Sequence, residues 1–214
     1  MSRVGVLGGT FNPPHIAHLI CAQEAYVQLE LDRVLLMPVA APPHKQARDD
    51  PGPERRVEMC REAVAGDDRL EVSRLEVDRG GPSYTVDTLR ELDARAPADE
   101  LYLIVGGDMA ETLPAWRDPA DILRLAVLAV VERGDTHRER ALASVHGILG
   151  DHAEDRVRLV DMPRVEISSS LVRDRVAAGR PIRYLVPGGV ERYIQDQGLY
   201  RTTRAGAGVE VPIR

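Results

Sequence analysis

Two histidines three residues apart, His15 and His18, follow a pair of glycines that stands directly after a short apolar run. The run, residues 4–7, is typical of a buried parallel strand, and Gly8-Gly9 allow a sharp turn and close approach of a ligand to the main chain. A helix that starts near His15 would place both imidazoles on one face, beside its own N-terminal N–H groups. We therefore predict a phosphate site at this turn.

A His-x-x-His pair by itself belongs more often to a surface or a core than to a site. Zinc would need a third ligand, and no Glu or Cys stands nearby at zinc spacing. The turn also lacks the G-x-G-x-x-G fingerprint of dinucleotide sites and the Gly-Lys-Ser/Thr of a P-loop. The glycine turn in front of the histidines is what favours phosphate.

A second cluster that could bind an anion consists of Ser168, Ser169, Ser170 and Arg173. At a helix start, the serines would offer a cap, hydroxyl donors and backbone N–H groups. Arg173 lies three residues after Ser170 and would point back over the same helix end. The structural alternative is a serine cap beside a surface arginine.

A Pro-rich loop after the predicted strand 34–37 carries His44 and Lys45, and Lys45 is the single lysine among 28 basic residues. Active sites of open parallel sheets lie at the carboxyl ends of the strands, so both side chains would arrive beside the glycine turn. A solvated loop without a role in binding is the alternative.

Asp108 follows Gly106-Gly107 after the predicted strand 101–105, where a carboxylate suits the hydroxyl groups of a ribose. Trp116, the only tryptophan, stands in a Pro-flanked stretch and could pack in the core or stack on a flat aromatic ligand.

Two further candidates for ligand binding stand at the start of a predicted helix and at the end of a predicted strand. Ser83 or Thr85 can cap a helix that runs to about residue 95, and its first N–H groups form another potential anion site, although such a cap is usually structural. Arg133 ends the predicted strand 126–132.

These residues require a scaffold in which strands alternate with helices. The apolar spacing predicts strands over 4–7, 34–37, 69–73, 75–77, 101–105, 126–132 and 157–160, and helices over 17–29, 55–65, 138–149 and 187–197. We expect an α/β fold, a Rossmann-like doubly wound parallel sheet flanked by helices, in a single domain over 1–200 with a disordered tail over 201–214.

Composition narrows the class of protein. The 214 residues suffice for one α/β domain, and the net charge of −6 argues against a general nucleic-acid binder. No apolar run could span a bilayer, and the first strand leaves no room for a signal peptide. Cys21 and Cys60 have no metal or redox spacing. We expect a cytoplasmic protein with neither membrane nor nucleic-acid partner.

The chain resembles the nucleotidylyltransferase superfamily, whose signature is Gly-Gly/Ser-Thr-Phe-Asp/Asn-Pro followed by His-x-x-His, with a late Ile-Ser-Ser/Thr-x-x-x-Arg. The third residue of the histidine motif is usually Gly in that superfamily and is Ala17 here. Within it, Pro-Pro-His-Lys, Gly-Pro-Ser-Tyr-Thr-Val-Asp-Thr-Leu, Val-Gly-Gly-Asp-Met and Pro-x-Trp resemble the bacterial nicotinate-mononucleotide adenylyltransferases. The resemblance covers roughly residues 4–200.

The resemblance implies an enzyme with two substrates, ATP and nicotinate mononucleotide. It implies that ATP is bound by Gly8, Gly9, Thr10, Phe11, His15, His18, Gly106, Asp108, Ser168, Ser169, Ser170 and Arg173. It implies that the mononucleotide is bound by Thr10, His44, Lys45, Tyr84, Thr85, Gly107, Asp108, Trp116 and Arg133. Catalysis would rest on His15, His18, Lys45 and Arg173, with His18 at the α-phosphate. Magnesium would be carried on the ATP phosphates without a dedicated protein site.

The implied reaction is attack of the mononucleotide phosphate on the α-phosphorus of ATP, giving deamido-NAD and pyrophosphate. Such a phosphate is already ionised at neutral pH, which fits a chain without an evident nucleophile–base pair. Two alternatives stay open: another acceptor, such as nicotinamide mononucleotide or phosphopantetheine, and a non-catalytic nucleotide-binding module. A dehydrogenase is disfavoured because the dinucleotide fingerprint is absent. The sequence leaves the oligomeric state open, a homo-oligomer included.

Overall fold

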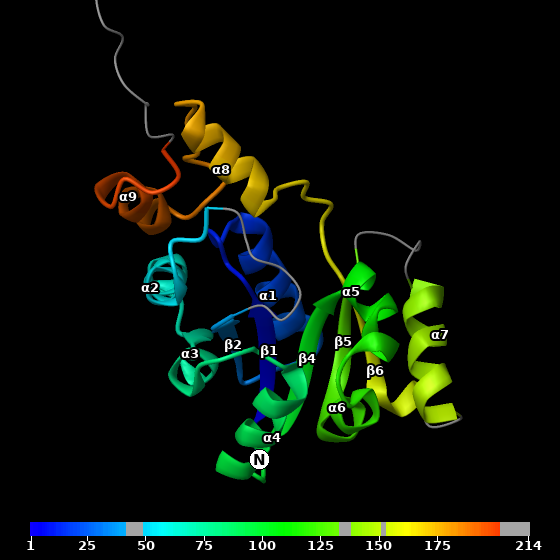
Figure 1. Ribbon diagram of the computed structural model, residues 1–214. Coiled ribbons are helices and arrows are strands. Elements are labelled where there is room, and N and C mark those ends of the chain that lie inside the picture. Colours follow the sequence, from blue (N-terminus) through cyan, green and yellow to red (C-terminus); the bar gives the residue numbers. More distant parts are fainter. Residues whose placement is uncertain (42–48, 133–137, 151–152, 202–214) are drawn as a thin grey trace, which may run out of the picture.

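The computed structural model describes residues 1–41, 49–132, 138–150 and 153–201. Within these ranges the strands form one parallel sheet in the order β3-β2-β1-β4-β5-β6 (Figure 1). The strands are β1 (Arg3–Gly9), β2 (Arg33–Pro38), β3 (Leu70–Val72), β4 (Glu100–Gly106), β5 (Ala126–Glu132) and β6 (Val157–Asp161).

The winding of the chain reverses at β1, which lies between the two halves of the sheet. Leu7 of β1 stands beside Leu36 of β2 on one side and beside Ile104 of β4 on the other. The chain runs outward from β1 to β3 and then returns to β4, so the carboxyl ends of β1 and β4 form the switch point at which open α/β sheets bind ligands. The predicted doubly wound, Rossmann-like fold is confirmed.

Helices cover both faces of the sheet. They are α1 (Ile16–Gln28), α2 (Pro53–Val64), α3 (Leu75–Arg79), α4 (Thr85–Arg95), α5 (Gly107–Glu111), α6 (Pro119–Leu125), α7 (Arg138–Leu149), α8 (Ser169–Ala177) and α9 (Gly188–Asp196), with short 3-10 helices at Leu113–Ala115 and Glu154–Arg156.

Alternate residues along the strands belong to two separate apolar clusters, one on each face of the sheet. Ile104 of β4 packs with α1 and α2 on one face, whereas Leu103 packs with α4, α5, α6 and α7 on the other. A third cluster joins α2 to α8 and α9, which lie beyond the carboxyl edge of the sheet, above the start of α1 (Figure 1). The C-terminal helices therefore lie next to the switch point.

Three local predictions are wrong. Gly8 and Gly9 do not form the predicted turn: both belong to β1 and pair with Met37 and Pro38 of β2, and the left-handed backbone conformation falls at Phe11 instead. Residues 75–77 belong to the helix α3 and not to a strand, because Arg74 pairs with Asp78 at i,i+4 and Gly80, with φ of 70°, ends the helix. Neither Ser83 nor Thr85 caps α4. Its N-cap is Tyr84 without a side-chain bond, and the Ser83 hydroxyl instead accepts from the Ala40 N–H at 2.9 Å.

Several predictions fall on parts of the chain outside the described residues. These are the positions of His44, Lys45 and Arg133 and the character of the tail after Arg201. In the part that is described, no helix is long and apolar enough to cross a membrane.

Candidate active site

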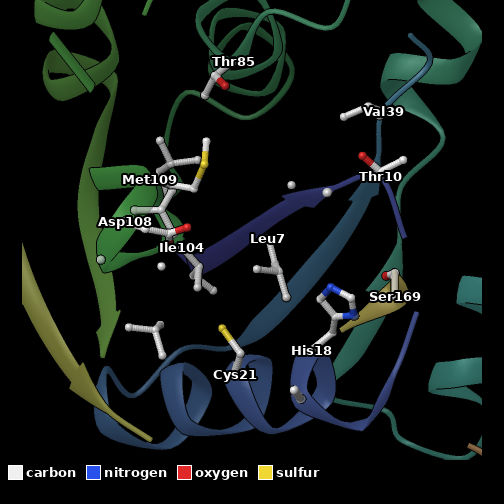
Figure 2. A pocket seen from close by; sticks show the side chains of 18 of the residues that line it. Leu7, Thr10, His18, Cys21, Val39, Thr85, Ile104, Asp108, Met109 and Ser169 are labelled. Atoms are coloured by element: carbon white, nitrogen blue, oxygen red, sulfur yellow. The ribbon is translucent and has the colours of Figure 1, made fainter. Parts of the chain in front are cut away.

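A cavity of about 1260 Å³ opens at the carboxyl ends of β1 and β4. In Figure 2 its floor is α1, with His18 and Cys21, and Thr85 of α4 lies on the opposite side. The predicted residues that line it are Gly8, Gly9, Thr10, His15, His18, Tyr84, Thr85, Gly106, Gly107, Asp108, Trp116, Ser168 and Ser169. Residues from four separate stretches of the chain thus meet in one space.

The turn after β1 is held from beneath by Phe11. Phe11 has φ of 49°, its side chain is 2% exposed, and its ring lies where a Cβ on Gly9 would come within 3.1 Å. A side chain at residue 9 would therefore push against the ring. The structure places Phe11 in the core below the turn, and its side chain is not among those that line the cavity.

The two histidines stack on each other at the start of α1. Their ring centroids are 3.7 Å apart with an interplanar angle of 26°, and the Phe11 ring meets that of His18 edge-on at 5.0 Å. His15 is the N-cap residue and is 6% exposed, whereas His18 is half-buried. Both imidazoles line the cavity at the helix end whose dipole favours anions, as the spacing predicts.

The late serine cluster contacts the same loop. The Ser168 hydroxyl caps α8 by accepting from the Leu171 N–H at 3.1 Å, as predicted. The Ser169 hydroxyl donates to the Pro13 carbonyl at 2.8 Å, which joins the two predicted phosphate sites directly.

Arg173 points back over the start of α8, as the spacing predicts. Its guanidinium donates to the Ser170 hydroxyl at 3.1 Å and to the Asn12 carbonyl at 2.7 Å. Arg173 and Ser170 line a second cavity of about 680 Å³ and are not among the residues of the large cavity.

The far end of the large cavity is lined by aromatic side chains and by the start of α4. The Trp116 Nε1–H donates to the hydroxyl of Thr112, the C-cap residue of α5, at 3.0 Å, which fixes the indole beside the end of α5. The Arg117 guanidinium lies 4.9 Å from the centre of the Tyr84 ring. Thr85 is the first residue of α4, so its N–H precedes the first intrahelical bond and is open to an anion.

Asp108 lies near the start of α5, across the cavity from Thr10 and Ser169 in the view of Figure 2. β4 passes directly into α5 at Gly106, and the Asp108 Oδ1 lies 2.8 Å from the position that a Cβ on Gly106 would take. Glycine at 106 therefore leaves room for the carboxylate, which is exposed at the mouth of the cavity.

Some lining residues were not predicted. Cys21 follows His18 by three residues on α1, so helical spacing alone could have placed it in the site. Met109 ends the Val-Gly-Gly-Asp-Met motif, whereas Glu132 and Met162 come from positions that carry no local signal. Among the described residues there is no group of three or more His, Cys, Asp or Glu that could hold a metal ion.

A doubly wound sheet with anion-binding helix starts at its switch point defines the chain as a nucleotide-binding α/β protein. The model of the cytidylyltransferase-like family matches residues 6–175. The nicotinate-nucleotide adenylyltransferase of Bacillus subtilis (strain 168) is 36% identical over 202 residues, which are 94% of this chain and 100% of that protein. The "Probable nicotinate-nucleotide adenylyltransferase" of Roseiflexus sp. (strain RS-1) is 45% identical over 199 residues, 92% of this chain and 98% of its own length.

The chain belongs to the cytidylyltransferase-like family and, within it, to the nicotinate-nucleotide adenylyltransferases. The fold is also that of the nicotinic acid mononucleotide adenylyltransferase of Plasmodium falciparum, solved in complex with NaAD. The TM-score is 0.75 at 17% identity, covering 94% of this chain and 98% of that one.

Proposed function

We propose that this protein transfers the adenylyl group of ATP to nicotinate mononucleotide, giving deamido-NAD and pyrophosphate. The observation that carries this proposal is the direct contact between the opening loop and the serine cluster, Ser169 to Pro13, beside the stacked histidines. Together they form a surface of N–H and O–H donors suited to a triphosphate. The relatives' shared name agrees with this assignment.

The cavity offers a separate place for each substrate. The triphosphate lies against Gly8, Gly9, the histidines and Ser169. Arg173, which lines the second cavity, and Lys45 add positive charge. The nicotinate ring stacks on Trp116, and its carboxylate accepts hydrogen bonds at the start of α4, where Thr85 stands. The Asp108 carboxylate, which also lines the cavity, accepts hydrogen bonds from ribose hydroxyls.

The reaction needs alignment more than acid–base chemistry. An oxygen of the mononucleotide phosphate forms the new bond to the α-phosphorus, and the bond from that phosphorus to the bridging oxygen of the pyrophosphate group breaks. The attacking phosphate has a second pKa of about 6 and is ionised at neutral pH, so no general base is required. His18 and the backbone N–H groups stabilise the charge on the equatorial oxygens at the transition state.

We propose that Mg²⁺ enters with ATP. The donors around Gly8 and Gly9 are imidazoles, hydroxyls and N–H groups, which fit phosphate oxygens, and the described residues contain no cluster of metal ligands. Bound to the phosphates, the ion would neutralise the charge that develops on the departing pyrophosphate.

The test is pyrophosphate release by the purified chain with ATP and Mg²⁺, comparing nicotinate mononucleotide with nicotinamide mononucleotide and with no acceptor. We expect turnover with both mononucleotides to exceed the background, with a higher kcat/KM for the acid because the start of α4 favours a carboxylate. A higher kcat/KM for nicotinamide mononucleotide would mean that the amide, and not the acid, is the acceptor. ATP binding without any product would show that the protein is a nucleotide-binding module and not an enzyme.

A further inference from the structure

The loop between β1 and α1, residues 10–15, is held by the last quarter of the chain. Residues 12–16 form hydrogen bonds with α8 and with the segments around α9, which lie beyond the carboxyl edge of the sheet (Figure 1). These bonds run from Ser169 Oγ to Pro13 O (2.8 Å), Arg173 Nη1 to Asn12 O (2.7 Å), Tyr200 OH to Asn12 Oδ1 (2.6 Å) and Ile16 N to Leu185 O (3.0 Å).

Tyr200 reaches this loop from an unusual backbone conformation. Its φ is 61°, in the left-handed region that bulky residues rarely adopt. Leu199 beside it is 6% exposed in the apolar cluster of α2, α8 and α9, which fixes the segment in place. Burial raises the pKa of the Tyr200 phenol, so the hydroxyl keeps its proton at neutral pH. Unfavourable backbone geometry of this kind persists where the surroundings enforce it.

Asn12 depends on that hydroxyl. Its side chain is 2% exposed, and Oδ1 accepts the Tyr200 bond, whereas Nδ2 is buried and has no hydrogen-bond partner in the described structure. Asn12 stands between Phe11, which supports Gly9, and the residues that lead into the histidines. The orientation of Asn12 therefore determines how both halves of the loop are presented.

We propose that Tyr200 is a positioning residue for adenylyl transfer, which acts by fixing Asn12 and with it the loop after β1 that presents His15 and His18. The inference rests on the proposed function. Ser169 and Arg173 also bind the loop, but the proposed function asks the same groups to bind phosphate. Tyr200 lines the second cavity and not the large one, so its bond to Asn12 can persist while the mononucleotide binds and leaves.

The test is Tyr200→Phe, which removes one hydroxyl and keeps the buried ring. Tyr193→Phe is the matched control, because Tyr193 packs on the same apolar cluster and no hydrogen bond of its hydroxyl occurs among the described contacts. We expect kcat to fall roughly tenfold or more in Tyr200→Phe, because small displacements of aligned groups are costly. The KM for the mononucleotide, held at the far end of the cavity, should stay within about twofold. Tyr193→Phe should match the wild type.

A second readout does not depend on turnover. Hydrogen–deuterium exchange at the amides of Phe11, Asn12 and His15 should be about fivefold faster in Tyr200→Phe, the factor expected for the loss of one hydrogen bond, with α4 unchanged. Adding Tyr200→Phe to Asn12→Ala should cause no further loss of kcat if the two side chains act as one unit.

Unchanged exchange and kcat in Tyr200→Phe would refute the positioning role, as would an equal loss in Tyr193→Phe. A lower unfolding temperature with normal kcat and normal loop exchange would reduce Tyr200 to a structural residue. If the wild type releases no pyrophosphate, the proposed function fails, and the exchange measurement still decides whether Tyr200 holds the loop.

Discussion

The backbone N–H of His15 donates a hydrogen bond to Nδ1 of His18, with 3.1 Å between the two nitrogens. A backbone amide can only donate, so Nδ1 of His18 must be an acceptor and the ring proton sits on Nε2. His18 in this arrangement is a neutral imidazole that carries its ring proton on Nε2. The first turn of α1 thus fixes the tautomer that a phosphate oxygen requires.

His18→Ala should lower kcat by roughly ten- to a thousandfold, because it removes one preorganised donor at the α-phosphate. Steady-state pyrophosphate release measures the effect, and circular dichroism checks the fold. The matched control is His146→Ala on α7, an exposed histidine outside the cavity, which should leave kcat unchanged. Near-normal turnover of His18→Ala would remove His18 from the mechanism.

The sequence predicts best where the physical cause is local. The strand 126–132 and the helix 138–149 were predicted with the bounds that the structure has, because β5 is buried along its whole length and α7 has helical apolar spacing. The Ser168 cap also follows from the chemistry of neighbouring residues, whereas Gly8 and Gly9, which were predicted to form a turn, are the last two residues of β1.

Where long-range packing decides, the sequence predicts little. The helices α5 and α6 have five and seven residues, too short for a clear apolar period, and neither was predicted. Tyr200 bonds to Asn12 across 188 positions, and Arg56 bonds to Thr10 across 46, so no spacing rule could link them. Many residues that line the cavity could be predicted, whereas Arg56 and Tyr200, which hold the loop after β1 in place, could not.

The fluorescence of Trp116 should report binding of the mononucleotide directly. Trp116 is the only tryptophan of the chain and lines the cavity, so its fluorescence should change on titration with nicotinate mononucleotide and much less with ATP alone. Trp116→Ala should raise the KM for the mononucleotide about tenfold or more, since stacking on an aromatic side chain contributes on the order of 1–3 kcal/mol per base. A rise confined to the KM for ATP would place the adenine at the indole instead.

The two cysteines should differ in reactivity. Cys21 is half-buried and its sulfur faces the cavity (Figure 2), whereas Cys60 is fully buried and burial raises the pKa of its thiol. Because the thiolate is the reactive form, a thiol reagent should modify one cysteine in the native protein, and ATP should slow that reaction. Cys21→Ser should abolish it. Rapid modification of two thiols without denaturant would contradict this arrangement.

Arg56 should be the costliest arginine to replace. Its side chain is fully buried on α2 and donates to the carbonyls of Thr10 (3.1 Å), Val39 (2.6 Å) and Ala40 (3.1 Å) and to the Asp50 carboxylate (3.0 Å). It therefore joins the residues that follow β1 to those that follow β2.

Arg56→Met should lower the free energy of unfolding by about 3–5 kcal/mol, because it leaves buried acceptors without donors. Arg56→Lys should recover only part of this, since one ammonium cannot reach all four acceptors. Urea denaturation measures both. Arg69→Met is the control: Arg69 pairs with Asp67 at the surface, with 41% of its side chain exposed, and its loss should barely move the midpoint. Equal midpoints for Arg56→Met and Arg69→Met would show that the buried guanidinium does not hold the two strand ends together.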